Sequence, residues 1–146
     1  MNRCKWVNLN NNFYVLYHDN EWGRPTRDDN LLFELLILEG FQAGLSWECI
    51  LNKRNYFKKA FSNFNPKEIV KYDENKINEL MNNKNIVRNR RKIEATIINA
   101  KVFLEIQKEY KTFANYIWSF TDNKVIKIWM IILKLLVHYR IKLVKI

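Results

Sequence analysis

The sequence predicts an all-α fold built around one hydrophobic core. The 146 residues include only 3 Gly and 2 Pro, too few for the many tight turns of an all-β protein. Residues 31–38 form an apolar run that is broken only by Glu34 and is too rich in Leu for a strand. Apolar residues make up 48% of the chain, so we expect one packed domain rather than a disordered chain.

The charge balance is strongly basic. The chain has 25 Lys and Arg residues against 15 Asp and Glu, a formal charge of +10. Such an excess favours polyanionic partners, with nucleic acid first and an anionic membrane second. The alternative is that the positive charge only reflects a lysine-rich composition and serves no binding partner. Two cysteines cannot form a disulfide framework, and the polar N-terminus shows no signal sequence, so we expect a cytoplasmic protein.

The first 25 residues combine turn signals with many aromatic side chains. The Asn residues at 8 and 10–12 predict a turn, residues 13–18 a short helical segment, and residues 19–25 an irregular connection. The aromatic residues either form a lid over the core or offer flat faces to a planar base. Cys4 and His18 are residue types that bind Zn²⁺, but two ligands do not make a site, and a free Cys plus an ordinary His is the alternative.

We expect the functional site between residues 31 and 47. Glu39 follows the apolar run, beside Gly40, and Ser46 can cap a further helix that starts with Trp47. A carboxylate at the end of an apolar helix is costly unless a polar or cationic group meets it. A surface Glu on a loop is the alternative interpretation.

The rest of the chain reads as a series of helices. The pattern predicts helices at residues 31–38 (capped by Asp28 or Asp29), 48–61, 65–72, 74–81, 93–110 and 113–120. Asn82, Asn83, Lys84 and Asn85 predict a tight hairpin between two of these helices. The helix at 48–61 carries a basic outer face.

Three short motifs stand out along this framework. They are CxWV at residues 4–7, YHDNEWG at 17–23 and LEGFQAGLSW at 38–47, and WSF at 118–120 accompanies them. Together they resemble the bacterial DNA-3-methyladenine glycosylase I family, over roughly the first four fifths of the chain. The resemblance implies an all-α, helix-hairpin-helix DNA glycosylase fold that lacks the family's C-terminal portion. It also implies hydrolysis of the N-glycosidic bond of 3-methyladenine in alkylated duplex DNA.

The resemblance assigns roles to individual residues. Glu39 resembles the base-recognising carboxylate, Tyr17 and Trp47 resemble stacking aromatic residues, and Trp6 and Trp22 resemble residues of the pocket wall. A purine methylated at N3 is a cation and leaves without a strong acid, so selectivity would rest on its charge. Electron-rich rings would favour the cation by about 1–2 kcal/mol when desolvated. An ionised Glu39 would accept hydrogen bonds from the exocyclic amine in a dry pocket.

Two further segments are expected to contact duplex DNA. Leu45, between Gly44 and Ser46, is either an apolar wedge that fills the gap left by a flipped base or a plug of the core. After the hairpin, backbone N–H groups and basic side chains suit a phosphate. Relatives usually have Gly where Asn85 stands, so we expect Asn85 in the left-handed conformation. An ordinary solvated basic face is the alternative for the residues concerned, which are Asn85, Arg88, Arg90 and Lys92.

The motif resemblance ends after Phe120, which divides the chain into a domain at 1–120 and a divergent, basic and apolar tail at 121–146. In the family a zinc ion ties the termini together. Cys4 and His18 match its N-terminal ligands, but the C-terminal ligands are absent and only His138 remains as a candidate. The tail is too charged to span a membrane. It could be a basic helix on a membrane surface, a replacement helix of the domain, or the product of a shifted reading frame, and we expect it to be helical.

We therefore expect a cytoplasmic, monomeric DNA repair enzyme that acts on double-stranded DNA containing alkylated adenine. Zinc is the cofactor that the family implies, with no organic cofactor and no protein partner. Truncation is expected to impair the activity. The alternatives are a catalytically silent helix-hairpin-helix module that only binds DNA, and a peripheral membrane protein that uses the tail.

Overall fold

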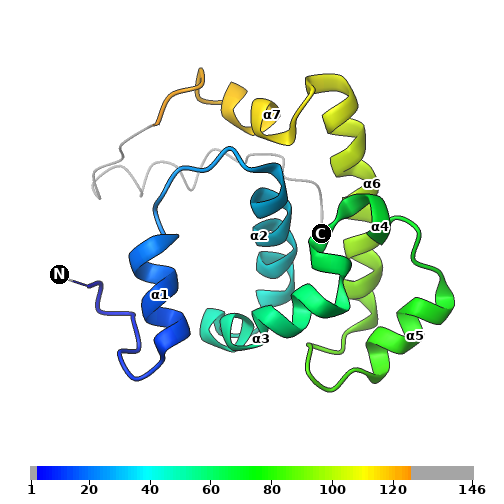
Figure 1. Ribbon diagram of the computed structural model, residues 1–146, viewed down its shortest axis with the longest axis horizontal. Helices are drawn as coiled ribbons and strands as arrows, with labels where there is room; N and C mark the ends of the chain where they lie inside the picture. The colour runs from blue at the N-terminus through cyan, green and yellow to red at the C-terminus, as the bar shows by residue number, and fades with distance from the viewer. Residues whose placement is uncertain (1–2, 126–146) are drawn as a thin grey trace.

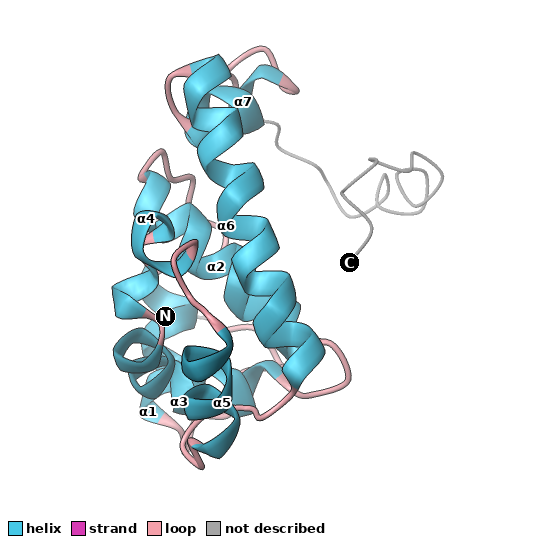
Figure 2. Ribbon diagram, turned by 90° about the vertical axis from the view of Figure 1, so that its right-hand side faces the viewer, coloured by secondary structure: helices cyan, strands magenta, loops and turns pink. Residues whose placement is uncertain are grey.

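The computed structural model describes residues 3–125, and this part of the chain consists of helices without a strand. The elements are α1 (Asn12–Asn20), α2 (Asp29–Gln42), α3 (Trp47–Ala60), the 3-10 helix η1 (Ser62–Phe64), α4 (Pro66–Ile69), α5 (Glu74–Asn82), α6 (Arg90–Tyr110) and α7 (Phe113–Ser119). In Figure 1, α2 lies between α1 and α6, with α3 below it and α7 above. Figure 2 shows α6 running along the molecule, with α7 at one end and α1, α3 and α5 at the other. The predicted all-α fold is confirmed.

The core forms around α2. Phe33 and Phe41 of this helix are 0% and 1% exposed. The ring of Phe33 lies 4.8 Å from that of Phe103 in α6, and the ring of Phe41 lies 4.7 Å from that of Phe57 in α3. Burying one such side chain contributes about 1.5–3 kcal/mol. These contacts hold α2 between two helices that follow it at very different distances along the chain.

The C-terminal end of α2 differs from the prediction. The helix continues through Glu39 and Gly40 to Gln42, and the chain breaks only at Gly44, where φ is +81°. Gly in a helix costs about 1 kcal/mol relative to Ala. Burial of Phe41 on the core offsets that cost, so Gly40 does not end the helix. Glu39 is therefore held on a helix instead of a loop.

The two candidate caps of α2 serve different helices. Asp28 accepts hydrogen bonds from two amides in the first turn of α2, at 2.9 and 3.4 Å, and is the N-cap. Asp29 accepts from the amides of Phe113 and Ala114 at the start of α7, both at 2.8 Å. The Asp29 carboxylate thus fixes α7 to the N-terminal end of α2, a contact that the sequence analysis did not predict.

Trp118 of α7 fastens the connection between α1 and α2. Its Nε1 donates to the backbone oxygen of Thr26 at 2.9 Å, and the guanidinium of Arg27 lies 4.4 Å from the ring centroid. Arg27 also donates to the backbone oxygen of Asn123 at 3.2 Å. The WSF motif therefore has a structural role at this end of the molecule.

A buried ion-pair network joins α1, α2 and α3. Glu34 of α2 is 6% exposed, accepts a hydrogen bond from Arg54 Nε at 2.5 Å and lies 3.1 Å from Lys58 Nζ. Arg54 also donates to both carboxylate oxygens of Glu21, at 2.7 and 2.9 Å. Since these three helices carry Tyr17, Glu39 and Trp47, the network fixes the relative positions of three of the predicted base-site residues.

The remaining helices lie close to their predicted positions, with two differences at their ends. The helix predicted at 93–110 begins earlier, because the side chain of Asn89 caps it by accepting from the amide of Lys92 at 3.2 Å. α4 is shorter than the helix predicted at 65–72.

The expected tail is described only in its first residues. Residues 121–125 form turns and coil instead of the predicted helix. His138 and the other tail residues lie outside the described range. Within residues 3–125 no helix is long and apolar enough to cross a membrane.

Candidate active site

Tyr17 and Trp47 meet where α1 packs against the start of α3. Asn11 sets this packing: its side-chain oxygen caps α1 by accepting from Phe13 N at 3.1 Å, and its Nδ2 donates to Glu48 of α3 at 2.8 Å. The rings of Tyr17 and Trp47 lie edge to face, with centroids 5.4 Å apart and an interplanar angle of 62°. Aromatic pairs favour this geometry. Two of the predicted base-binding residues are therefore neighbours.

Glu39 lies in the last turn of α2, and its side chain is exposed. Partial burial alone raises the pKa of its carboxyl, with no charged or hydrogen-bonding partner contributing among residues 3–125. Burial also raises the pKa of Tyr17, and the negative charges of Glu39 and Glu21 raise it further. The Glu39 carboxylate is thus within electrostatic reach of the Tyr17 hydroxyl. Tyr17 and Trp47 are therefore in contact, Glu39 is exposed rather than enclosed in a dry pocket, and the grouping of all three around a base stays a prediction.

The indole N–H of Trp47 is a buried donor that has no partner among the described residues. The indole lies near enough to the Tyr17 hydroxyl to act against the rise in the pKa of Tyr17, yet its Nε1 makes no hydrogen bond within residues 3–125. A buried donor without a partner costs about 1–3 kcal/mol. A bound molecule that presents an acceptor to Trp47 would remove this cost.

Trp6 and Trp22 pack around His18 rather than on the ring of Tyr17. The centroids of Trp6 and Trp22 are 5.2 Å apart, and the His18 ring lies 5.3 Å from Trp6 and 5.6 Å from Trp22. The two indoles are 40% and 47% exposed. This aromatic cluster is separate from the ring contact of Tyr17 with Trp47. A pocket-wall role for the two tryptophans stays a prediction.

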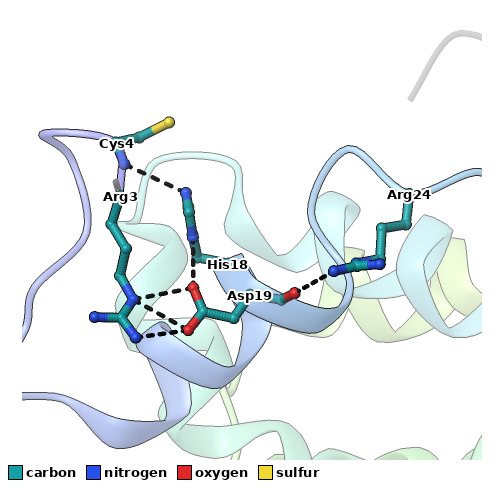
Figure 3. Close-up of polar contacts among 5 residues, drawn as sticks. All are labelled: Arg3, Cys4, His18, Asp19 and Arg24. Carbon is teal, nitrogen blue, oxygen red and sulfur yellow. Dashed lines mark hydrogen bonds and ion pairs between the residues drawn. The ribbon is translucent and has the colours of Figure 1, made fainter. Parts of the chain in front are cut away.

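Cys4 and His18 are neighbours, as Figure 3 shows, but the contact does not involve the Cys4 sulfur. The backbone N–H of Cys4 donates to His18 Nε2 at 3.3 Å, and His18 Nδ1 lies 2.9 Å from Asp19 Oδ1. A carboxylate behind the ring is usual for a metal-binding His. Here, however, the opposite ring nitrogen already accepts a hydrogen bond. No group of three His, Cys, Asp or Glu residues within 3–125 is arranged for a metal. These residues alone therefore do not fit a zinc ion.

The carboxylate of Asp19 anchors the N-terminal segment. Arg3 donates to both of its oxygens at 2.8–3.0 Å (Figure 3), and hydrogen bonds from Arg3 and then His18 hold the pKa of Asp19 far below its ordinary value. Arg24 donates to the backbone oxygen of Asp19 at 2.7 Å. These contacts give the Asp of the YHDNEWG motif a structural role.

Leu45 lies on the turn between α2 and α3 and is 41% exposed. Its amide donates to the backbone oxygen of Gln42 at 2.6 Å, after Gly44 in the left-handed region that favours Gly. The interpretation of Leu45 as a core plug is therefore wrong, and its role as a wedge stays a prediction.

The hairpin between α5 and α6 turns at Lys84 and Asn85. The amide of Asn85 donates to Asn83 Oδ1 at 3.0 Å, and its φ is not positive, so the predicted left-handed conformation is wrong. The Asn83 side chain closes the turn in its place, as Asn side chains commonly do. In the described part of the chain, the amides of Val87 and Arg88 make no internal hydrogen bond. The hairpin therefore offers two backbone donors to a ligand.

The predicted phosphate-binding side chains lie in different surroundings. Arg90 pairs with Glu74 at 2.6 Å and with Glu94 at 2.8 Å, so its charge is largely compensated. Lys92 Nζ donates to two backbone oxygens at the end of α2, at 2.6 and 2.8 Å. Arg88 is exposed and has no ion pair within residues 3–125. Of the three side chains, only Arg88 keeps a charge that no contact within the described residues engages.

Sequence analysis missed the residues that hold the site together, namely Glu21, Glu34 and Arg54. A signal was present, because Glu34 is the only charge in the apolar run 31–38 and a buried carboxylate needs a cation. The sequence does not identify that cation. Arg54 lies 20 positions away, on a helix whose basic residues are predicted to face the solvent.

Comparisons with known proteins agree with this architecture. A model of the methyladenine glycosylase family matches residues 6–134, which extends past Phe120 into the predicted tail. The DNA-3-methyladenine glycosylase of Haemophilus influenzae is 44% identical over 124 residues, and DNA-3-methyladenine glycosylase 1 of Escherichia coli is 40% identical over 124 residues. Both alignments cover 85% of this chain and 66% of the relative, so this chain spans slightly less than two thirds of their length.

A solved structure supports the same conclusion for the fold. A variant of 3-methyladenine DNA glycosylase I in complex with 3-methyladenine superposes on this chain with a TM-score of 0.81 at 37% sequence identity. The superposition covers 85% of this chain and 66% of that one.

Proposed function

Because this chain belongs to the methyladenine glycosylase family, we propose that it hydrolyses the N-glycosidic bond of 3-methyladenine in alkylated duplex DNA. The observation that carries the proposal is the grouping of Tyr17, Glu39 and Trp47. It combines two electron-rich rings with a carboxylate that no cation of residues 3–125 engages. Such a grouping suits a flat, positively charged molecule.

Each of the three side chains has a part in recognising the base. The faces of Tyr17 and Trp47 attract a cationic purine over a neutral one, by about 1–2 kcal/mol once water is excluded. The Glu39 carboxylate accepts hydrogen bonds from the exocyclic amine. The unpartnered Nε1 of Trp47 donates to a base acceptor. Insertion of the base covers the open site, which strengthens each electrostatic contact.

The reaction needs little acid catalysis. The bond between C1′ and the purine nitrogen breaks as the cationic base takes the bonding electron pair and leaves as neutral 3-methyladenine. Water then adds its oxygen to C1′ of the oxocarbenium-like sugar and releases a proton. The chain's part is to hold the extruded base and to stabilise positive charge with the ionised Glu39.

Duplex DNA is held at the hairpin between α5 and α6 in this proposal. A backbone phosphate can bind to the exposed Arg88 side chain and to the amides of Val87 and Arg88, which have no partner within residues 3–125. In this proposal Leu45 fills the gap left by the extruded nucleotide, which its exposure on the turn before Trp47 supports. Phosphate contacts would fix the register, whereas the base site would supply selectivity.

Release of free 3-methyladenine from alkylated duplex DNA tests this function. We expect the full chain to release the base, and Glu39→Gln to lower the single-turnover rate by about 10- to 100-fold, the value of a hydrogen bond to a charged group. Affinity for a duplex with an abasic-site analogue should stay nearly unchanged. Glu105→Gln, the same change at an exposed position of α6, is the matched control.

Two outcomes would contradict the proposal. A wild-type chain that binds DNA but releases no base would be a DNA-binding module without catalytic activity. An equal loss of base release and duplex affinity in Glu39→Gln would remove Glu39 from base recognition and place it in general DNA binding.

A further inference from the structure

The ammonium group of Lys92 is bound to the end of another helix. Lys92 is in the first turn of α6, and its Nζ donates to the backbone oxygen of Phe41 at 2.8 Å and to that of Ala43 at 2.6 Å. Lys92, Gly40, Phe41 and Thr96 line a cavity of about 20 Å³. A side chain predicted to bind phosphate thus has two of its three donors engaged inside the protein.

The position of Lys92 is unfavourable for its own helix. The N-terminus of α6 carries the positive end of the helix dipole, where a cation is disfavoured. The C-terminus of α2 leaves carbonyl groups without helical partners, where a cation is favoured. The bonds from Lys92 therefore join the positive end of one helix to the negative end of another, and this pairing offsets the local cost.

The segment that Lys92 binds connects the parts of the base site. Glu39 lies in the last turn of α2, just before the two bound carbonyls. After them come the turn with the exposed Leu45 and the first residue of α3, Trp47. A shift of this short segment would move the carboxylate, the apolar side chain and one aromatic ring together.

A second contact ties the hairpin to the same region. Lys53 of α3 donates from Nζ to the backbone oxygen of Asn85 at 3.3 Å. The hairpin is thus linked to α3 through Lys53, and the helix that follows it is linked to α2 through Lys92. Movement of the hairpin would be transmitted to α2 and α3, which carry Glu39 and Trp47.

We propose that Lys92 is a positioning residue, not a phosphate ligand: it clamps the end of α2 and the Leu45 turn to α6, and so couples DNA held at the hairpin to the geometry of the base site. This proposal rests on the proposed function. It differs from the sequence-based expectation in a measurable way. A phosphate ligand would affect the salt dependence of DNA binding, whereas a clamp would affect binding of the base itself.

The test compares Lys92→Met, which keeps the aliphatic stem but removes the ammonium, with the full wild-type chain. We expect the slope of log K against log salt for abasic-analogue duplex to stay unchanged. Affinity for free 3-methyladenine and the single-turnover release rate should both fall about tenfold or more, because small misplacements of a site are costly. Lys92→Arg, which retains charge and donors, should restore both. Lys101→Met, at an exposed position further along α6, is the matched control.

The outcomes separate this proposal from the proposed function. A slope reduced by about one counterion in Lys92→Met, or an unchanged affinity for free base, would overturn the clamp. A wild-type chain without base release refutes the proposed function, while the slope of the variant still decides whether Lys92 binds phosphate. A wild-type chain that binds no DNA refutes both. If Lys92→Met shows no cooperative melting transition, Lys92→Gln takes its place in the same measurements.

Discussion

Glu39 shows how a single residue can be favourable for function and unfavourable for stability. Its carboxyl is partly buried without a cation from residues 3–125, and this burial raises its pKa. A charged group that lacks a partner costs the folded state free energy. The same property lets the carboxylate attract a cationic ligand, since no cation among the described residues competes for it.

The pH dependence of stability tests this balance. Because the pKa of Glu39 is higher in the folded chain than in the unfolded one, the folded chain binds the proton more tightly. Below the pKa of Glu39 in the unfolded chain, the protonated carboxyl costs the folded state no stability. As the pH rises through the folded pKa, the carboxyl ionises and the chain loses stability. We expect Glu39→Gln to melt at a higher temperature than wild type at pH 7 and at the same temperature below about pH 4.

The difference in melting temperature should be small, because the Glu39 side chain is exposed and solvent screens its charge. Glu105→Gln serves as the control and should melt like wild type at both values of pH. A Glu39→Gln variant that melts at a lower temperature than wild type at pH 7 would show that the carboxylate is stabilised by contacts.

At the scale of the element, the buried pair of Glu34 and Arg54 fixes how α1, α2 and α3 meet. Burial by itself would lower the pKa of Arg54, but hydrogen bonds from its guanidinium to Glu21 and Glu34 raise it. The Arg54 and Glu34 side chains are 15% and 8% exposed. A pair this buried is costly to break, because one charge is left in the core without its main partner.

We expect Arg54→Met to lower the free energy of unfolding by about 3 kcal/mol, measured by urea denaturation at neutral pH. The value lies at the low end for buried pairs because Lys58 remains 3.1 Å from Glu34. The double variant Glu34→Leu/Arg54→Met should recover most of the loss. Lys58→Met, whose wild-type side chain is 40% exposed, should cost less than about 1 kcal/mol. Additive losses in the double variant would mean that the pair is not coupled.

At the scale of the whole molecule, the formal charge of +10 attracts DNA without specifying where it binds. The structure reduces the number of candidate contacts at the hairpin. Internal partners engage Arg90 and Lys92, and Arg88 is the predicted side chain whose charge is not engaged within residues 3–125. Charge counted along the sequence therefore overestimates the charge that can reach a phosphate.

Arg88→Ala should reduce the slope of log K against log salt for duplex binding by about one counterion. The loss of affinity should be similar for alkylated and undamaged DNA, because a phosphate contact carries no base information. Lys101→Ala on the exposed side of α6 should leave the slope unchanged. An unchanged slope in Arg88→Ala would exclude this side chain from the DNA interface.

Much of the fold followed from local patterns. The apolar run at 31–38, the capping residues Asp28 and Ser46 and the scarcity of Gly predicted helices that the structure contains. Predictions failed where a tertiary contact, or a side chain two residues away, outweighed the preference of a single residue. Gly40 does not end α2, because Phe41 is buried on the core, and Asn85 is not left-handed, because the side chain of Asn83 closes the turn.

The sequence by itself determined the helical class, the family and the residue types of the base site, because periodicity, capping and motif spacing are local properties of the chain. Only the tertiary structure decided which charges remain available. Arg54 forms an ion pair with Glu34, Lys92 donates hydrogen bonds to the end of α2, and Glu39 has no cation as a partner within residues 3–125. The physical reason is that a charge acts according to the partners within a few ångströms, and folding brings those partners from distant positions in the chain.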